Sequence, residues 1–534
     1  MGWVMADLST RLDRWAGHRP DAPAIGFEGR TWNYAGLAMS VARIAGMLRN
    51  RFGVERGERV AYCGTNRPEL VIALFACARL GAIFVPLNWR LTPYELSITL
   101  ADADASVLIG DEELLTAIDA RRADLPVLRH NVGVDDSLFS DADAGAAPCD
   151  PAGGLDDPLL IVYTSGTTGH PKGAVLTQAA LAANAVNATH FQDLTSADHA
   201  LTVIPMFHVG GLNIQTVPLL LGGGRVTLHR RFDPAAWLAD VEAERPTLSV
   251  LVPATMQAVQ LHPSWPTTDL SSLRLVVTGS SAVPAPLIEA FHARGVPVAQ
   301  MYGSTETAPI AVHQRADTAM RFVGSTGVAA SLCELRIIDD DDRAVAQGVP
   351  GEILVRGPNL FAGYWRAPEA TTASLLFDGD GTAGDGTAGD ERDGNGHGDR
   401  RPWFRTGDIG YVDADGQLVI SDRKKDMIIS GGENVYPAEI EQALAGCPGV
   451  AEVAVVGQLD HRWGEVPVAV IVASDDSSLD EIVVRTWLTD RLAPFKMPRA
   501  VVFVDELPRN AMGKVLKHEV KARLAGETGD QPAS

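Results

Sequence analysis

The stretch LLIVYTSGTTGHPKG (residues 159–173) decides the fold class, because a buried strand runs directly into a polar, glycine-rich loop. Residues 159–162 have the unbroken apolar character of a strand that is covered on both faces. The loop supplies hydroxyl groups, backbone N–H groups and the cation of Lys172, which can converge on phosphate oxygens. It differs from a Walker A loop, since Pro171 replaces the glycine before the lysine and Gly173 replaces Ser or Thr. The stretch therefore predicts a phosphate-binding loop that follows a strand of an α/β fold.

Similar apolar runs recur along the chain between stretches of helical character. They span residues 59–63, 106–109, 201–204, 248–252 and 273–278. Runs without strict alternation are typical of covered parallel strands in βαβ units. Residues 70–87 indicate a buried helix that continues into a buried strand, since Arg79, Gly81 and Pro86 interrupt the apolar stretch. The sequence therefore predicts layered βαβ sheets.

The composition argues against several classes of protein. The chain has 534 residues, with 45 Lys plus Arg against 67 Asp plus Glu and a formal net charge of −22. Its length predicts about two to four packing units. The acidic balance argues against a nucleic-acid or anionic-lipid partner, because such binding depends on Lys and Arg. Five scattered cysteines without a CxxC pair suggest neither a zinc site nor a disulfide framework.

The apolar segments are too short or too interrupted for a signal peptide or a membrane span. We therefore expect a protein of the reducing cytoplasm with no membrane span, although a peripheral membrane contact stays open. The oligomeric state is left open between a monomer and a homodimer.

Three further segments carry side chains suited to a nucleotide. QMYGSTET (residues 300–307) offers the Tyr302 ring for stacking on a base and the Glu306 carboxylate as a hard ligand for Mg²⁺ on a triphosphate. Asp408 can accept hydrogen bonds from both hydroxyls of a ribose. Lys514 follows a glycine turn near the C-terminus. Each signal is weak alone and gains its weight from the others.

Residues 378–401, DGDGTAGDGTAGDERDGNGHGDRR, break the composition of the chain. Apolar side chains nearly vanish there, so we expect a disordered, mobile surface insertion. Two GxGxxG matches inside it neither follow a strand nor open a helix, which argues against a dinucleotide fingerprint. Beyond it, residues 403–420 predict two strands round a turn at Asp415-Gly416, and Pro437 begins a predicted helix with acids in its first turn.

These segments, in this order, resemble the adenylate-forming superfamily of acyl-CoA synthetases, luciferases and peptide-synthetase adenylation domains. The resemblance rests on YTSGTTGHPKG, YGSTET, RTGD, DRKKDMIISGGENVYPAEIE and PRNAMGKVLK, and it covers nearly the whole chain apart from residues 378–401. Within the superfamily the chain is most similar to bacterial AMP-forming fatty-acyl-CoA synthetases. The resemblance implies an α/β fold with a large N-terminal AMP-binding domain (1–422), a hinge (423–425) and a small mobile α+β C-terminal domain (426–534).

The implied reaction converts a carboxylic acid, ATP and CoA into acyl-CoA, AMP and pyrophosphate, with Mg²⁺ as the metal. The resemblance assigns Glu306 and Thr164 to Mg²⁺, and Asp408 and Arg423 to the ribose. The remaining nucleotide residues that it implies are Ser165, Gly166, Thr167, Thr168, Gly169 and Lys172 at the phosphates, and Gly279, Ser280, Ser281 and Tyr302 around the adenine. Gly303, Ser304 and Thr305 are also implied to bind the nucleotide.

Further roles follow from the same resemblance. Lys514 would act on the carboxylate and the α-phosphate in the first step, and Lys425 would be the hinge about which the C-terminal domain rotates before the second. Ser430, Gly431 and Gly432 would line the pantetheine channel. His208 would orient groups near the carboxylate and the CoA entrance, and its alternative is a packed aromatic side chain.

The substrate is expected to be a monocarboxylic acid, because residues 206–221 contain no Lys or Arg to pair a second carboxylate. Gly210 and Gly211 suggest space for an extended chain, which favours a medium- or long-chain fatty acid and a role in fatty-acid metabolism. Two alternatives stay open. One is a CoA ligase for aryl acids such as benzoate or coumarate, and the other is a fatty-acyl-AMP ligase that feeds a carrier protein.

Overall fold

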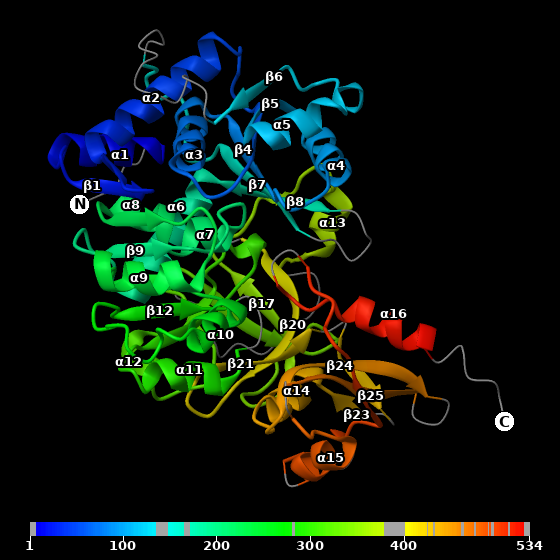
Figure 1. Ribbon diagram of the computed structural model, residues 1–534. Helices are drawn as coiled ribbons and strands as arrows, with labels where there is room; N and C mark the ends of the chain where they lie inside the picture. Colours follow the sequence, from blue (N-terminus) through cyan, green and yellow to red (C-terminus); the bar gives the residue numbers. More distant parts are fainter. Residues whose placement is uncertain are drawn as a thin grey trace.

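The computed structural model describes residues 7–134, 148–164, 171–279, 283–378, 401–423, 426–430, 433–460, 464–474, 477–489, 491–492, 496–510 and 513–527. In this part of the chain the strands form four β-sheets, and most helices pack around the two largest of them (Figure 1). The 378–401 insertion lies outside the described residues except at its two ends.

A nine-stranded sheet forms the centre of the large unit. Its strand order is β15-β14-β13-β12-β11-β9-β10-β1-β2, and the six strands from β13 to β1 run parallel. The strands are β1 (Pro23–Phe27), β2 (Arg30–Asn33), β9 (His199–Thr202), β10 (Arg225–Leu228), β11 (Leu248–Val250), β12 (Leu275–Thr278), β13 (Val298–Tyr302), β14 (Val312–His313) and β15 (Val328–Ala329). Short antiparallel pairs close both edges of the sheet.

A seven-stranded sheet has the order β18-β8-β7-β4-β3-β5-β6, with parallel pairing from β7 to β6. Its strands are β3 (Arg59–Cys63), β4 (Ile83–Leu87), β5 (Ala105–Gly110), β6 (His130–Gly133), β7 (Pro158–Thr164), β8 (Lys172–Thr177) and β18 (Gly363–Tyr364). β8 pairs antiparallel with β7 and with β18, so residues 363–364 are attached to the strand that begins at Lys172.

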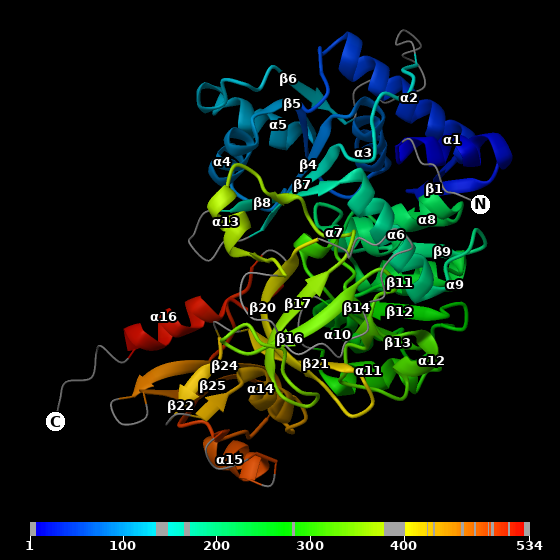
Figure 2. The same cartoon turned by 180° about the vertical axis from the view of Figure 1, so that it is seen from behind.

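Two smaller sheets complete the fold. The first is antiparallel and contains β16 (Glu334–Ile338), β17 (Gly351–Arg356), β19 (Leu375–Leu376), β20 (Trp403–Val412) and β21 (Leu418–Arg423). The second contains β22 (Ile428–Ser430), β23 (Glu433–Val435), β24 (Val450–Asp460), β25 (Gly464–Ala473) and β26 (Ala500–Phe503). Figures 1 and 2 place this last sheet, with α14 (Pro437–Ala445) and α15 (Glu481–Thr489), at the end of the molecule opposite the N-terminal helices.

The other helices pack mainly around the large sheets, whereas α16 packs against β24 of the C-terminal sheet. They are α1 (Ser9–His18), α2 (Tyr34–Asn50), α3 (Pro68–Leu80), α4 (Pro93–Ala103), α5 (Glu112–Asp119), α6 (Gln178–Gln192), α7 (Val209–Gly211), α8 (Val217–Gly222), α9 (Pro234–Glu244), α10 (Pro253–Leu261), α11 (Ala285–His292), α12 (Ala316–Ala319), α13 (Pro368–Ala373) and α16 (Lys517–Glu527). α4 starts with a capping box in which Thr92 and Glu95 exchange hydrogen bonds, and α3 ends at Gly81 with φ 72°.

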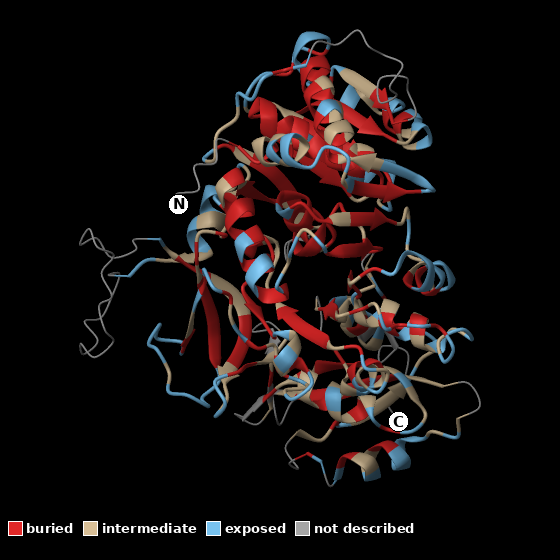
Figure 3. Ribbon diagram, turned by 90° about the vertical axis from the view of Figure 1, so that its left-hand side faces the viewer, coloured by how far each residue is buried: buried red, intermediate tan, exposed pale blue. Residues whose placement is uncertain are grey.

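One hydrophobic core joins the nine-stranded and seven-stranded sheets. Its buried side chains come from strands of both sheets and from α2, α3 and α6. α3 is apolar on all sides and almost entirely buried, as expected of a helix enclosed by other elements. Figure 3 shows the buried strands inside and exposed residues on the outer helices. The large unit therefore offers a rigid framework for loops at the strand ends.

Most expectations about the elements are confirmed. The apolar runs coincide with β3, β5, β7, β9, β11 and β12, although the predicted ends differ by up to two residues. Residues 70–87 form α3 and β4, and residues 403–420 form the antiparallel strands β20 and β21. The α/β class with a large N-terminal and a small C-terminal domain is also confirmed. The 423–425 hinge and the mobility of the C-terminal domain stay predictions. Among the described residues, every helix is too short or too polar to cross a bilayer.

A buried histidine predicts a pH dependence of stability. His313 is 5% exposed, and its ring stacks on Phe191 with centroids 4.6 Å apart. Burial, followed by the nearby Arg315 and His190, lowers the pKa of His313 from 6.5 to about 4. Between these values the unfolded chain binds the proton more readily, so stability falls as the pH falls from 6.5 towards 4. At pH 5 this cost is about 2 kcal/mol.

We expect His313→Phe, which keeps a ring against Phe191, to remove this cost. The loss of unfolding free energy between pH 7 and pH 5, measured by urea denaturation, should be about 2 kcal/mol smaller in the variant. His18→Phe, at an exposed histidine, is the control and should keep the full dependence. An unchanged pH dependence in His313→Phe would contradict the assignment.

Candidate functional site

The carboxyl ends of four parallel strands meet at one edge of the nine-stranded sheet. β9, β11, β12 and β13 are neighbours in this sheet and run in the same direction. The segments that follow them, which include residues 203–208, Gly279 and residues 303–307, therefore emerge side by side. Open α/β sheets bind ligands in the crevice at this edge.

The Tyr302 hydroxyl donates a hydrogen bond to the Asp408 carboxylate at 2.8 Å. Tyr302 ends β13, whereas Asp408 lies on β20 of the antiparallel sheet, and Tyr302 also packs against the core of that sheet. Asp408 is 8% exposed and faces Arg423 across the β20–β21 ladder. The structure thus joins two predicted nucleotide residues from separate sheets. It describes the backbone of Arg423 but not its side chain.

Glu306 lies in a tight turn directly after β13. The Ser304 N–H donates to Thr307 Oγ1 at 2.9 Å and closes the turn of residues 305–307. Gly303 is required there, since a β-carbon would lie 1.7 Å from the Pro309 carbonyl oxygen. Glu306 is 8% exposed, and its Oε1 accepts a hydrogen bond from the Tyr364 hydroxyl at 2.7 Å. The turn therefore holds one buried carboxylate beside the nucleotide residues.

The predicted phosphate loop connects β7 to β8. Thr164 and Lys172 are opposite each other in the antiparallel ladder, and Thr164 Oγ1 donates to the Lys172 carbonyl at 3.3 Å. The Lys172 ammonium lies 5.5 Å from the centre of the Tyr364 ring. Tyr364 therefore contacts Glu306 and Lys172, which come from different sheets.

Several predicted residues fall outside the described part of the chain, and their roles stay predictions. They are Ser165, Gly166, Thr167, Thr168, Gly169, Ser280, Ser281, Lys425, Gly431 and Gly432. Two predicted site residues that border these gaps are described. Gly279 lacks room for a side chain, because a β-carbon would lie 2.6 Å from the Met301 carbonyl oxygen. Ser430 pairs with Gly464 in the C-terminal sheet.

His208 follows β9 and caps the short helix α7. Its ring packs on Phe207 with centroids 4.3 Å apart, and in the part of the chain that the structure describes its buried Nε2 has no hydrogen-bond partner. Burial, followed by Arg90, lowers the pKa of His208 to about 3. The imidazole is therefore neutral near pH 7. The ring of His208 is packed against Phe207, and its Nε2 could form a hydrogen bond with a ligand.

Sequence reasoning missed Asn213. This residue lies in a π-helix, Leu212–Thr216, and is 1% exposed, yet both polar atoms of its side-chain amide lack hydrogen-bond partners among the described residues. An unpaired buried polar group costs about 1–3 kcal/mol, so a ligand that satisfies it gains that energy. The Asn184 side chain donates to the main-chain carbonyl of Asn213 at 2.7 Å and accepts from the main-chain N–H of Ile310 at 3.1 Å. The π-helix is thereby linked to the segment that carries Glu306.

The two glycines expected to leave space for an acyl chain differ in the structure. A β-carbon on Gly211 would lie 2.3 Å from the Pro205 carbonyl oxygen, so close backbone packing explains this glycine. A β-carbon on Gly210 would meet Ile204 and Ile214 at 3.7 and 3.9 Å, which are ordinary contacts. The expectation was therefore wrong for Gly211.

A basic cluster next to His208 carried no sequence signal. The Arg90 and Arg231 guanidinium groups lie 5.1 and 4.3 Å from the centre of the Trp89 ring. Arg90 also lies 5.9 Å from the Phe207 ring. Burial, followed by the like charge of Arg231, lowers the pKa of Arg90. Two cations held close together favour an anionic ligand.

Lys514 is exposed, and its loop lies against the large unit. Its backbone N–H donates to Asn510 Oδ1 at 3.0 Å, and Gly513 adopts φ 78°. A β-carbon on Gly513 would lie 4.0 Å from that of Ala254. Ala254 is in the first turn of α10, just past the carboxyl end of β11. The lysine loop therefore lies near the edge of the sheet where the nucleotide residues gather.

The donor set fits a metal ion that arrives on a polyphosphate. Among the described residues, no group of three His, Cys, Asp or Glu side chains could hold a metal. Mg²⁺ commonly uses one or two carboxylates together with substrate phosphates and water. The buried Glu306 carboxylate is such a partial set, and Thr164 at the end of β7, opposite Lys172, is the hydroxyl that the sequence predicts beside it.

Two family profiles match the chain. Residues 12–365 match the AMP-binding enzyme family, and residues 439–514 match the AMP-binding enzyme C-terminal domain. Individual relatives extend the match. The chain is 48% identical to an indoleacetate–CoA ligase of Aromatoleum aromaticum, covering 98% of this chain and 99% of the relative. It is 44% identical to a feruloyl-CoA synthase of an Amycolatopsis species, covering 95% and 96%.

A solved structure agrees with these matches. A fatty acyl CoA synthetase of Mycobacterium tuberculosis superposes with a TM-score of 0.74 at 33% identity, covering 98% of this chain and 99% of that one.

Proposed function

Because the chain belongs to the AMP-binding enzyme family, we propose that it activates an aromatic carboxylic acid with ATP and transfers the acyl group to CoA. The coarser activity is that of an ATP-dependent acid–thiol ligase, since the matched relatives are CoA ligases and synthases over nearly their full length. The observation that carries the aromatic assignment is the 48% and 44% identity to ligases of indoleacetate and ferulate, against 33% for the fatty acyl enzyme. The aryl-acid alternative is thus better supported than the fatty-acid preference.

Two structural features support an aromatic substrate. Gly211 allows close backbone packing and does not open space for a substrate. One of the two glycines that suggested an extended acyl chain is therefore explained without such a chain. The buried Asn213 side-chain amide has no partner within the described ranges of the chain. A hydrocarbon chain would leave this amide unpaired, whereas a phenol or an indole N–H can hydrogen-bond to it. The 33% identity to a fatty acyl CoA synthetase keeps a fatty acid as the second candidate.

The reaction has two steps with one intermediate. In the first step a carboxylate oxygen of the acid forms a bond to the α-phosphorus of ATP. The bond from that phosphorus to the oxygen that bridges the α- and β-phosphates breaks, and pyrophosphate is released. In the second step the CoA sulfur forms a bond to the acyl carbon, and the bond from that carbon to the AMP oxygen breaks. The thiol proton leaves with a base or with water.

The chain's own residues orient these groups. Asp408 accepts hydrogen bonds from the ribose hydroxyls, and Tyr302 faces the base. Lys172, which begins β8, and Thr164, which ends β7, bind the phosphates. Glu306 and Thr164 would hold Mg²⁺, which supplies positive charge to the phosphate oxygens.

The other two substrates have their own contacts in this proposal. Neutral His208 would contact the carboxylate of the acid through Nε2. The paired arginines Arg90 and Arg231 suit the phosphate groups of CoA.

Lys514 acts in the first step in this proposal. Its ammonium stabilises the negative charge that develops where the carboxylate meets the α-phosphate. A preorganised donor of this kind contributes about 3–4 kcal/mol, or about 10² to 10³ in rate. The position of its loop against the start of α10 supports this role.

We expect Lys514→Ala to slow adenylate formation by about 10² to 10³ and to leave thioester formation from supplied acyl-AMP and CoA nearly unchanged. Pyrophosphate release reports the first half reaction, and chromatography of the thioester reports the second. Lys521→Ala, also in the C-terminal domain, is the control and should affect neither. Equal losses in both half reactions would contradict the role.

The acid preference can be tested with matched substrates. The pairs are 4-hydroxycinnamate with cinnamate, and indole-3-acetate with its N-methyl derivative, with octanoate and palmitate as aliphatic acids. We expect aromatic acids to give the highest kcat/KM, and the hydrogen-bonding member of at least one pair to exceed its partner by about tenfold or more. Asn213→Leu should reduce that ratio towards one. If palmitate is preferred, the aromatic assignment fails; if the ratio survives in Asn213→Leu, the role of Asn213 fails.

A further inference from the structure

Tyr364 connects the two groups that the proposed function places at the phosphates. Its hydroxyl donates to Glu306 Oε1 at 2.7 Å, and the Lys172 ammonium lies 5.5 Å from the centre of its ring. An ionised carboxylate has only acceptor oxygens, so the phenol hydroxyl is the donor in this bond.

The segment Phe361–Trp365, here called the brace, holds Tyr364 at both ends. The Phe361 N–H donates to the Glu306 carbonyl at 2.8 Å, and the Trp365 N–H donates to the Gly173 carbonyl at 2.7 Å. The brace therefore binds the backbone of the Glu306 turn and the backbone next to Lys172. Through these bonds it fixes the separation of two loops that belong to different sheets.

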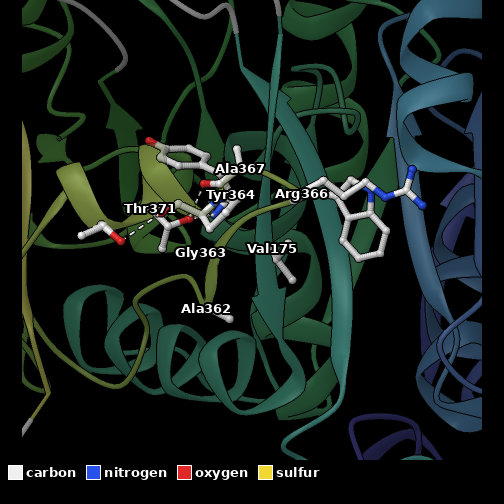
Figure 4. Close-up of a pocket in the computed structure, with 10 residues that line it drawn as sticks. Val175, Ala362, Gly363, Tyr364, Arg366, Ala367 and Thr371 are labelled. Carbon is white, nitrogen blue, oxygen red and sulfur yellow. Dashed lines mark hydrogen bonds between the residues drawn. The ribbon is translucent and has the colours of Figure 1, made fainter.

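The Tyr364 side chain and backbone have little freedom within the brace. The Phe361 ring meets the Tyr364 ring edge-on with centroids 4.9 Å apart. The Tyr364 N–H donates to Thr371 Oγ1 at 2.8 Å, a bond drawn in Figure 4. The same figure shows Tyr364 among the residues that line a pocket next to β18 and α13. The volume of this pocket is about 480 Å³. The hydroxyl is therefore presented to Glu306 by a rigid support.

We propose that Tyr364 is a positioning residue for the metal-bound nucleotide: its hydroxyl fixes Glu306 Oε1, so that Oε2 is presented to the divalent cation carried by ATP. Among the described residues, Oε2 accepts no hydrogen bond. The terminal torsion of a glutamate is broad, so an untethered carboxylate samples many orientations. Mg²⁺ demands near-ideal octahedral geometry, and a carboxylate fixed through one oxygen loses less entropy on binding it. This inference rests on the proposed use of ATP with a divalent cation.

The test measures nucleotide binding rather than turnover. Titration calorimetry gives the Kd of α,β-methylene-ATP, which does not react, in Mg²⁺ and in EDTA. Tyr364→Phe keeps the ring beside Lys172 and removes the hydroxyl. We expect its Kd to rise about tenfold in Mg²⁺ and to change less than twofold in EDTA. Tyr94→Phe, at an exposed tyrosine, is the matched control and should match the wild type in both.

Each outcome decides a separate point. If the Kd of Tyr364→Phe rises equally in Mg²⁺ and EDTA, or in neither, the positioning role is overturned. In a Glu306→Gln background, Tyr364→Phe should add less than twofold, because the hydroxyl acts through the carboxylate. A full additional tenfold effect in that background would also overturn the role. If the wild type shows no metal-dependent binding, the proposed function fails rather than this inference.

Discussion

Three β-sheets meet at one short segment, residues 302–307, and the site depends on this junction. The segment follows β13 of the nine-stranded sheet. Tyr302 ties it to the antiparallel sheet through Asp408, and Glu306 ties it to the seven-stranded sheet through Tyr364. Hydrogen bonds that include a carboxylate are strong and directional. The two tyrosine hydroxyls, together with the main-chain bonds of Phe361 and Trp365, therefore set how the predicted ribose, metal and phosphate groups lie relative to one another.

The sequence predicted much of the fold because its signals are local. Unbroken apolar runs located β3, β5, β7 and β12, since strands covered on both faces need no polar alternation. The pairing of β20 with β21 followed from the Asp-Gly turn. Element ends were less predictable, because they depend on where the chain turns away from the sheet. β9, for example, ends at Thr202 although the apolar run continues to Ile204.

Motif residues with distinctive chemistry, such as Glu306, Asp408 and Lys172, could be chosen as candidates from the sequence, and their roles stay predictions. Tyr364, Asn213 and Arg231 could not be found in this way. The importance of Tyr364 arises from β18, a two-residue strand that pairs with β8 across a long stretch of sequence. Asn213 draws attention only because folding buries its side-chain amide without a hydrogen-bond partner among the residues that the structure describes. Gly211 illustrates the opposite error, since a glycine can mark close backbone packing as well as open space.

The most direct test of the account follows one oxygen atom through the reaction. Indole-3-acetate or 4-hydroxycinnamate with ¹⁸O in its carboxylate is incubated with the enzyme, ATP, Mg²⁺ and CoA, and the nucleotide product is analysed by mass spectrometry. The account predicts AMP that carries one ¹⁸O, because the carboxylate oxygen bonds to the α-phosphorus and stays with AMP when the thioester forms. Unlabelled AMP, or ADP with labelled inorganic phosphate, would contradict it.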